Sequence, residues 1–332
     1  MTPRPSRREL DEDDVRVRRP GRSRPRTRVR PVHDDAHPGL VTAVDRGRYG
    51  CYVDGRVVIA MQARELGRRS VVVGDRVRIV GDVSGDDDAL ARIVRVDQRT
   101  SALRRTADDD DPVERVIVAN ADQLVIVAAL ADPPPRPRLI DRCLVAAYDA
   151  DLEPLLCLTK SDLGDPNALL TMYAPLGVPA VVAGRPHLDA DIARLRAHLA
   201  GRVSVLVGHS GVGKSTIVNR LVPSAERAVG AVNLATGRGT HTSSSAVALM
   251  LPGGGWIVDT PGIRSFGLAH VTPATIVEAF PDLAPGTAEC PPGCTHAVDA
   301  PGCALDAYVT SGKATPARLD SLRRLLASRE SE

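Results

Sequence analysis

Two short segments of this chain carry residue types that recognise a nucleotide. The first is Gly208-His-Ser-Gly-Val-Gly213-Lys214-Ser215, which fits the pattern G-x-x-x-x-G-K-[ST]. It directly follows the apolar stretch VSVLV and precedes the helix-compatible stretch STIVNRLV. In that setting, glycines allow backbone N–H groups to converge on a β-phosphate at a helix N-terminus. The segment therefore predicts the phosphate-binding loop (P-loop) of a protein that binds a nucleoside triphosphate.

The same chemistry assigns roles within the P-loop. We expect Lys214 to reach the β- and γ-phosphates, and the Ser215 hydroxyl to ligate Mg²⁺. The alternative is a glycine-rich turn that matches the pattern by chance. The residues predicted to contact the phosphates are Gly208, His209, Ser210, Gly211, Val212, Gly213, Lys214, Ser215 and Thr216.

The second segment is LCLTKSDL, residues 156–163, in which Thr-Lys-x-Asp follows a predicted buried strand. Guanine presents N1–H and the N2 amino group as parallel donors that one carboxylate accepts together, whereas adenine does not. Asp162 therefore predicts selection of GTP over ATP, with the Lys160 stem lying along the base. Thr159 replaces the more usual asparagine, which weakens the contact expected near O6 and N7. The predicted guanine site comprises Thr159, Lys160, Ser161 and Asp162, unless this is an ATP-using protein in which the four residues are accidental.

Two segments downstream of the P-loop supply further ligands. Asp259-Thr-Pro-Gly262 ends the apolar stretch WIVD, so Asp259 offers a second Mg²⁺ ligand and the Gly262 N–H can sense a γ-phosphate. GRGTHTSSS, residues 237–245, is polar and is placed to be a mobile switch loop that closes on Mg²⁺. Thr242 is the predicted switch ligand, with Thr240 or Ser243 as alternatives. The other interpretation is an ordinary Ser/Thr-rich loop.

Strands and helices are predicted to alternate around these segments. Helical spacing occurs near residues 138–150, 166–175, 188–200 and 214–222, between the apolar stretches QLVIVAAL, LEPLLCL, VPAVVA, VSVLV, AVALML and GWIVD. This alternation predicts an α/β doubly wound sheet over residues 113–268. The guanine segment precedes the P-loop, the reverse of the usual GTPase order. Because strand order along the chain does not matter to the ligand and domain termini often lie close together, we predict a circularly permuted GTPase.

The segments on either side of this domain differ in character. Short β-branched stretches between Gly and Asp turns predict a small β-barrel over residues 39–100, followed by a polar linker at 101–112. Residues 1–38 are rich in Arg and Pro, so we expect a disordered tail. That tail is either simply solvated or an arm that neutralises nucleic-acid phosphates. Residues 269–332 form the predicted C-terminal domain, with helical pieces around a Cys/His cluster.

Cysteine usage separates two groups. Cys51, Cys143 and Cys157 are isolated in apolar surroundings and are expected to be small buried hydrophobes. Cys290, Cys294 and Cys303 instead gather around His296, which in a cytosolic chain suggests metal binding more than disulfides.

Composition limits the classes of partner. The chain has no apolar run of about 18 residues, so it is expected to be soluble and cytoplasmic with no membrane partner. Aromatic residues make up only 2% of the chain, so base stacking cannot dominate any contact with RNA. Arginine–phosphate attraction and shape are expected to carry such a contact.

On these motifs, the chain resembles the RsgA family of circularly permuted GTPases over about residues 39–325. The shared features are the barrel, ANADQLVIV leading into LIDRCLVAAYDA, the order TKSD–GHSGVGKST–GRGTHTSS–DTPG, and the terminal Cys/Cys/His/Cys segment. The resemblance implies an OB-like barrel and GTP hydrolysis to GDP, stimulated by the 30S ribosomal subunit late in its maturation. It also implies 16S rRNA binding by a monomer. The Arg-rich tail is not part of the shared pattern.

The resemblance also implies ligands and a catalytic residue. Cys290, Cys294, His296 and Cys303 would hold one structural Zn²⁺, although Cys294 and His296 are displaced by one residue from the usual family spacing; a metal-free cluster is the alternative. Ile263, just after the Gly262 position, cannot orient water as the glutamine of Ras-like enzymes does. The resemblance points instead to His241, whose alternative role is contact with RNA phosphate. A non-catalytic RNA-binding module gated by GTP is the competing function.

Overall fold

The computed structural model describes residues 33–66, 71–86, 89–106, 114–223, 246–260, 268 and 270–329. By its internal contacts, the chain divides into residues 1–34 and residues 35–332. All the helices and strands named here belong to the second unit.

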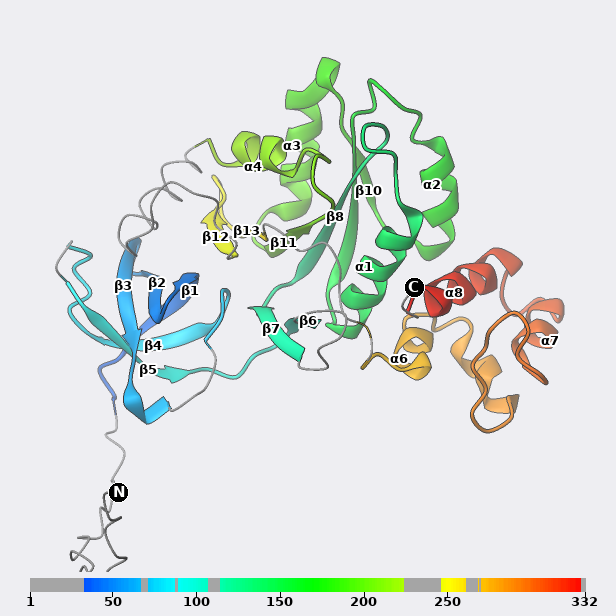
Figure 1. Ribbon diagram of the computed structural model, residues 1–332, viewed down its shortest axis with the longest axis horizontal. Coiled ribbons are helices and arrows are strands. Elements are labelled where there is room, and N and C mark those ends of the chain that lie inside the picture. Colours follow the sequence, from blue (N-terminus) through cyan, green and yellow to red (C-terminus); the bar gives the residue numbers. More distant parts are fainter. Residues whose placement is uncertain are drawn as a thin grey trace, which may run out of the picture. The chain divides into compact units, whose positions relative to one another are not determined.

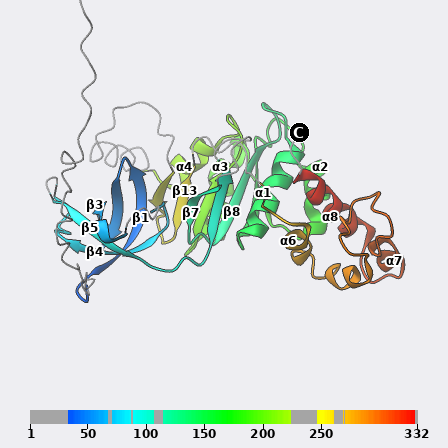
Figure 2. The ribbon, with the colours of Figure 1, turned by 60° about the horizontal axis from the view of Figure 1, so that its bottom comes forward.

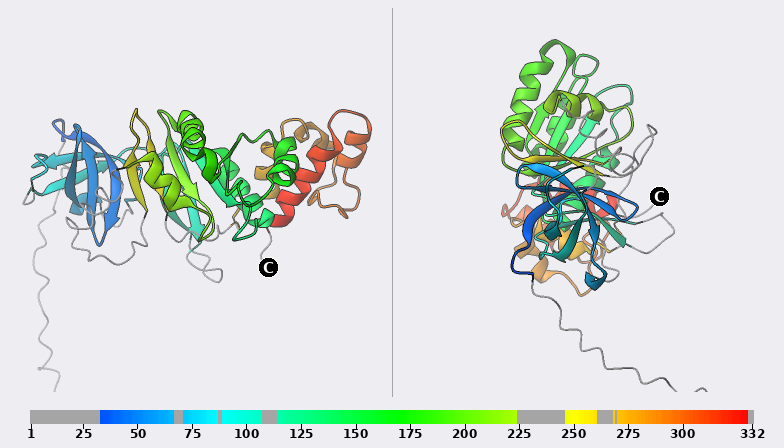
Figure 3. Two further views of the ribbon diagram at one scale, coloured as in Figure 1. Left: turned by 90° about the horizontal axis from the view of Figure 1, so that it is seen from above. Right: turned by 90° about the vertical axis from the view of Figure 1, so that its left-hand side faces the viewer.

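Five short strands form a barrel (Figure 2, Figure 3). They are β1 (His37–Asp45), β2 (Arg48–Val53), β3 (Arg56–Gln62), β4 (Arg76–Gly81) and β5 (Ala91–Val96). Their order is β1-β2-β3-β5-β4, and β1 also pairs with β4, which closes the barrel. A five-stranded barrel of this kind is the predicted OB-like fold. β1 begins at His37, before the predicted start of the barrel at residue 39.

The predicted polar linker at 101–112 is wrong over its first part. Residues Ala102–Thr106 form strand β6, which pairs antiparallel with β7 (Glu114–Ala119). Leu103 lies opposite Val118, and both side chains are buried. The Arg and Thr residues make this stretch polar overall, so the sequence did not reveal that Leu103 faces the core. Burial of the Leu103 side chain stabilises the β6–β7 hairpin.

A second set of strands forms the predicted doubly wound sheet (Figure 1). Its strands are β8 (Gln123–Ala129), β9 (Glu153–Thr159), β10 (Ala180–Val182), β11 (Val203–Val207), β12 (Val247–Met250) and β13 (Trp256–Asp259). The order is β10-β9-β8-β11-β13-β12, and only β12 is antiparallel to its neighbour in this set. Parallel strands require crossover connections, and the helices α1 (Pro137–Asp149), α2 (Asn167–Tyr173), α3 (Leu188–Leu199) and α4 (Lys214–Leu221) supply them, with 3₁₀ turns at Ala174–Leu176 and Arg185–His187.

The central strand β8 is buried on both faces, as its continuous apolar run predicts. Leu124 and Ile126 pack in the core that contains α1 and α2. Val125 and Val127 pack in the core that contains α3 and α4. The helices on the two faces thus hold the carboxyl ends of β8, β9 and β11 side by side.

The barrel and the GTPase sheet are joined through their edge strands. Ala43 of β1 pairs antiparallel with Val247 of β12, which makes one sheet of 11 strands. The rings of Tyr52 and Trp256 meet edge to face nearby, with centroids 5.1 Å apart. The pairing covers the edge that β12 would otherwise leave open.

The C-terminal domain is made of short helices that end in one longer helix. These are α6 (Pro273–Glu278), the 3₁₀ turn at Ala284–Glu289, α7 (Leu305–Thr310) and α8 (Pro316–Ser328). Arg324 of α8 donates to the buried carboxylate of Asp141 on α1, which fixes α8 against the doubly wound domain. No helix within the described ranges is both long and apolar enough to cross a membrane.

Candidate active site

The P-loop leaves β11 at Val207 and ends where α4 begins at Lys214. Gly208, Gly211 and Gly213 all have positive φ, a region that favours glycine. A Cβ at Gly208 would lie only 2.2 Å from the carbonyl oxygen of Val127 on β8. The motif glycines are therefore needed both for the turn and for its close approach to the neighbouring strand.

Two charged groups face each other beside this loop. Lys214 Nζ donates to the carbonyl oxygens of Gly208 and His209, so its ammonium lies across the mouth of the P-loop. Asp259 lies opposite Leu206 in the pairing of β13 with β11. Burial lowers the pKa of Lys214 and raises that of Asp259, and the attraction between the two groups opposes both shifts. This pair can bind a polyphosphate and a divalent cation together.

The guanine segment lies at the same edge of the sheet. Thr159 is the last residue of β9, and its Oγ1 donates to the carbonyl oxygen of Val212 in the P-loop at 2.7 Å. Lys160 adopts positive φ, and its Nζ donates to the carbonyl oxygen of Asp132 after β8. The structure thus brings the two predicted segments together. It also gives Thr159 a partner in the P-loop, where the sequence suggested only a weakened contact to the base.

A third loop, which sequence reasoning missed, completes this edge. Residues 183–185 follow β10, and the N–H of Arg185 donates to Oδ1 of Asp162 at 3.1 Å. The N–H of Ser161 donates to the carbonyl oxygen of Ala183. The available signal was a glycine at the carboxyl end of a predicted strand, VPAVVAG, because parallel strands end at one edge of a sheet.

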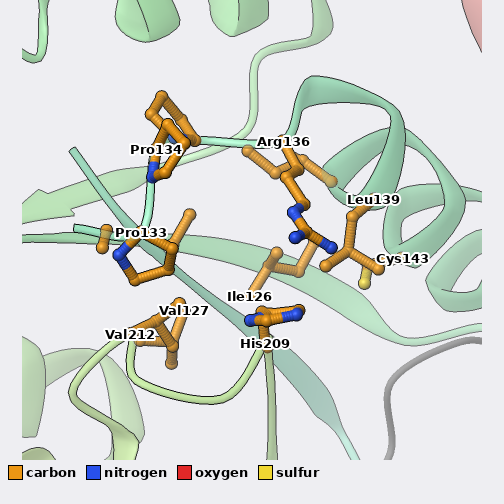
Figure 4. A pocket seen from close by; sticks show the side chains of 14 residues that line it. Ile126, Val127, Pro133, Pro134, Arg136, Leu139, Cys143, His209 and Val212 are labelled. Carbon is orange, nitrogen blue, oxygen red and sulfur yellow. The ribbon is translucent and has the colours of Figure 1, made fainter. Parts of the chain in front are cut away.

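A small hollow lies beside the P-loop (Figure 4). Its lining is mostly apolar and comes from β8, the proline-rich turn after it, α1 and the P-loop. Among the described residues that line it, His209 and Arg136 are the only ionisable groups besides the buried thiol of Cys143. The described lining residues therefore offer no carboxylate for a metal ion.

Several predicted residues lie outside the described residues. They are the switch residues Thr240, His241, Thr242 and Ser243, together with Gly262 and Ile263. The structure does describe the strands that flank them, β12 after the switch segment and β13 before Gly262.

The C-terminal cysteines and histidine form a second candidate site. The ligand atoms of Cys290, Cys294, His296 and Cys303 all lie within 4.8 Å of one another. Nδ1 of His296 is 3.6 Å from Sγ of Cys290 and 3.8 Å from Sγ of Cys303. Ligands at about 2.3 Å (sulfur) and about 2.0 Å (nitrogen) from a tetrahedral zinc ion lie about 3.5–3.8 Å from one another. The cluster could hold one metal ion, and its donors suit zinc.

The local backbone turns sharply around the Cys/His cluster. Gly293 and His296 both have positive φ, so the chain turns sharply on either side of Cys294. Nε of Arg323 on α8 donates to the carbonyl oxygen of His296 at 3.3 Å. Burial, followed by the charge of Arg323, lowers the pKa of His296, which favours the neutral imidazole that a metal requires.

The chain is similar to known proteins. A family model described as RsgA GTPase matches residues 96–269. A relative from Chlorobaculum tepidum, named small ribosomal subunit biogenesis GTPase RsgA, is 37% identical over 304 residues, or 87% of this chain and 97% of that protein.

Two solved structures show the same fold. YjeQ from Thermotoga maritima gives a TM-score of 0.65 at 24% identity, over 89% of this chain and 98% of that one. YloQ, described as a circularly permuted GTPase, gives a TM-score of 0.64 at 22% identity, over 90% of this chain and 96% of that one. The predicted fold class is thereby confirmed: a barrel, a circularly permuted GTPase domain and a small metal-binding domain. The chain belongs to the RsgA GTPase family, and it is a GTPase whose guanine segment precedes its phosphate loop.

Proposed function

We propose that this GTPase acts in the biogenesis of the small ribosomal subunit, and that the subunit stimulates its hydrolysis of GTP to GDP and phosphate. The observation that carries the nucleotide part is the hydrogen bond between Thr159 and Val212, which holds the guanine segment and the P-loop at one edge of the sheet. The ribosomal part is supported by the name of the relative from Chlorobaculum tepidum.

Roles within the nucleotide site are assigned from the chemistry of its residues. Asp162 reads the N1–H and N2 amino groups of guanine, and the Lys160 stem lies along the base. Backbone N–H groups of Gly208–Thr216 surround the phosphates, with Lys214 neutralising the β- and γ-phosphates. Thr159 supports the P-loop, because its hydroxyl donates to the carbonyl oxygen of Val212. Gly262 senses the γ-phosphate through its N–H.

Two metal ions complete the proposal. Mg²⁺ would be held by Ser215, Thr242 and Asp259, and when bound it neutralises charge on the phosphates. Zn²⁺ would be held by Cys290, Cys294, His296 and Cys303, where three thiolates and one imidazole make a closed structural set. A closed set leaves no position for substrate, so the zinc would stabilise the fold and take no part in hydrolysis.

Contact with the subunit is proposed to occur through 16S rRNA, made by a monomer in the cytoplasm. Arginine dominates the basic residues, and aromatic residues make up only 2% of the chain. Phosphate contacts are therefore expected to outweigh base stacking, so that affinity falls steeply with salt.

The deciding measurement is multiple-turnover phosphate release from GTP, titrated with purified small subunits. The proposal expects slow release alone and saturable acceleration with subunits. ATP should give no accelerated release, and Asp162→Asn should weaken GTP binding. A rate that is unchanged at every subunit concentration would contradict the ribosomal role while leaving the GTPase assignment in place.

A further inference from the structure

A buried carboxylate lies behind the guanine segment with no role in the site described so far. Asp191, in the first turn of α3, is only 5% exposed. Its Oδ2 accepts the backbone N–H of Gly184 at 3.0 Å, in the loop 183–185 that follows β10 (Figure 1). The ionised carboxylate makes this a charge-assisted bond, stronger than one between neutral groups.

The other oxygen of Asp191 is also held. Oδ1 accepts from Nη2 of Arg194 at 2.5 Å, one turn further along the helix, and the same nitrogen donates to the carbonyl oxygen of Val182 at 3.2 Å. Because Arg194 holds Oδ1, the carboxylate keeps one orientation, in which Oδ2 faces the N–H of Gly184.

The loop that Asp191 holds in turn contacts Asp162. The Arg185 N–H donates to Oδ1 of Asp162 at 3.1 Å, and the Ser161 N–H donates to the carbonyl oxygen of Ala183 at 3.1 Å. The fit leaves little space, since a Cβ on Gly184 would lie 2.3 Å from Oγ of Ser161 and 3.4 Å from Oδ1 of Asp162. A shift of Gly184 would move the adjacent N–H of Arg185, which is the donor that contacts the Asp162 carboxylate.

We infer that Asp191 is a positioning residue for guanine selection: by holding Gly184 it places loop 183–185, which orients the carboxylate of Asp162 toward the base. The inference rests on the proposed reading of guanine by Asp162. A carboxylate can accept several hydrogen bonds, so the bond from Arg185 leaves Asp162 able to accept both N1–H and the N2 amino group.

The test compares the affinities of GDP and IDP by calorimetry. Hypoxanthine lacks the 2-amino group, so the ratio of the two affinities reports the contact of Asp162 with that group. Asp191→Ala removes the acceptor for Gly184, and we expect the GDP-to-IDP affinity ratio to fall about tenfold, the scale of one hydrogen bond to a charged group. Asp191→Asn keeps one oxygen acceptor for Gly184, but its amide nitrogen cannot accept from Arg194. We therefore expect the ratio to fall by about threefold in this variant, less than in Asp191→Ala.

A purely structural role for Asp191 predicts a different pattern, in which both affinities fall together and the ratio is unchanged. That outcome would overturn the inference, as would an Asn variant as defective as the Ala variant. The matched control is Asp189→Ala, which removes an 86% exposed acid from the same helical turn. An equal fall of the ratio in that control would also overturn it.

If Asp191→Ala does not fold, Arg194→Ala provides the test instead. Arg194 is 65% exposed, and its loss frees the orientation of Asp191 without removing the acceptor. We expect a fall of about threefold in the ratio, less than the scale of a full hydrogen bond, and a ratio equal to the parent's would count against the inference. The ratio is also measured for Asp162→Asn. If this variant leaves the ratio unchanged, the assignment of Asp162 to guanine fails. If the ratio falls strongly in Asp162→Asn but not in Asp191→Ala, only the role of Asp191 is rejected.

Discussion

At the scale of single residues, the hydroxyl of Thr159 connects the two predicted nucleotide segments of the chain. The group is buried and donates to the carbonyl oxygen of Val212, so it links the end of β9 to the P-loop. Valine has nearly the same shape and suits a strand equally well, but cannot donate. We predict that Thr159→Val lowers the free energy of unfolding by about 1–3 kcal/mol, because a buried carbonyl loses its donor.

The same change should weaken GDP and IDP binding by similar factors, because the P-loop binds the phosphates that both share. Denaturant unfolding followed by the fluorescence of Trp256, the single tryptophan, gives the stability. Thr159→Ser retains the hydroxyl and is the control. A selective loss of GDP over IDP in the valine variant would show that Thr159 reads the base after all.

The proposed role of His241, which lies outside the described residues, gives a second prediction. If it orients the attacking water, His241→Ala should lower the subunit-stimulated rate at least about tenfold, within the range of a positioned catalytic group. GTP affinity should stay nearly unchanged, because water alignment matters in the transition state only. Single-turnover hydrolysis at saturating small subunits measures this directly. A parental rate with weakened subunit binding would instead indicate contact with RNA phosphate.

At the scale of elements, the metal cluster decides whether the turns between the 3₁₀ segment at Ala284–Glu289 and α7 are held in place. These turns have few buried apolar side chains, so a metal would supply much of their folding free energy. We predict about one zinc per chain in protein purified without chelators, and its loss in Cys294→Ser. Residues near 285–305 should then exchange their amide hydrogens faster, as local unfolding requires.

The matched control lies in the same loop. Asp299 is exposed and is not among the four clustered residues, so Asp299→Ala should retain zinc. Metal analysis by mass spectrometry and hydrogen exchange check both variants. Parent protein that contains no zinc, or a Cys294→Ser variant that keeps it, would reject the metal assignment.

At the scale of the whole molecule, the Arg-rich N-terminal segment is predicted to add affinity for the subunit and little to catalysis. A chain that begins at Asp35 keeps all of β1, which starts at His37 and pairs with β4, whereas a start at Gly39 would remove paired residues. The shortened chain should bind subunits with a smaller salt dependence, since fewer phosphates are neutralised.

Turnover at saturating subunits should match that of the full chain. Binding measured at several salt concentrations, together with phosphate release at saturation, tests both halves of this prediction. Lower turnover at saturation would mean that the N-terminal segment acts in hydrolysis as well as in binding.

Much of the site was readable from local patterns. Glycines with a lysine and a serine after an apolar strand indicated the P-loop, and the structure places three of those glycines at positive φ. Thr-Lys-x-Asp after a buried strand indicated the guanine segment, and its place before the P-loop indicated the permutation. These motifs can be recognised in the sequence because backbone turns and ligand chemistry depend on a few adjacent residues.

The tertiary structure alone decided which groups meet. The partner of Thr159 lies 53 residues away, in the P-loop. The loop that meets Asp162 follows another strand, and the acceptor behind that loop, Asp191, looks in the sequence like an ordinary acid in a helix's first turn. The pairing of Ala43 with Val247 likewise joins distant strands. Such contacts depend on strand order and on packing across the sheet, which adjacent residues do not specify. Adjacent residues therefore determined the chemistry of each motif. Only the folded sheet determined how the motifs support one another.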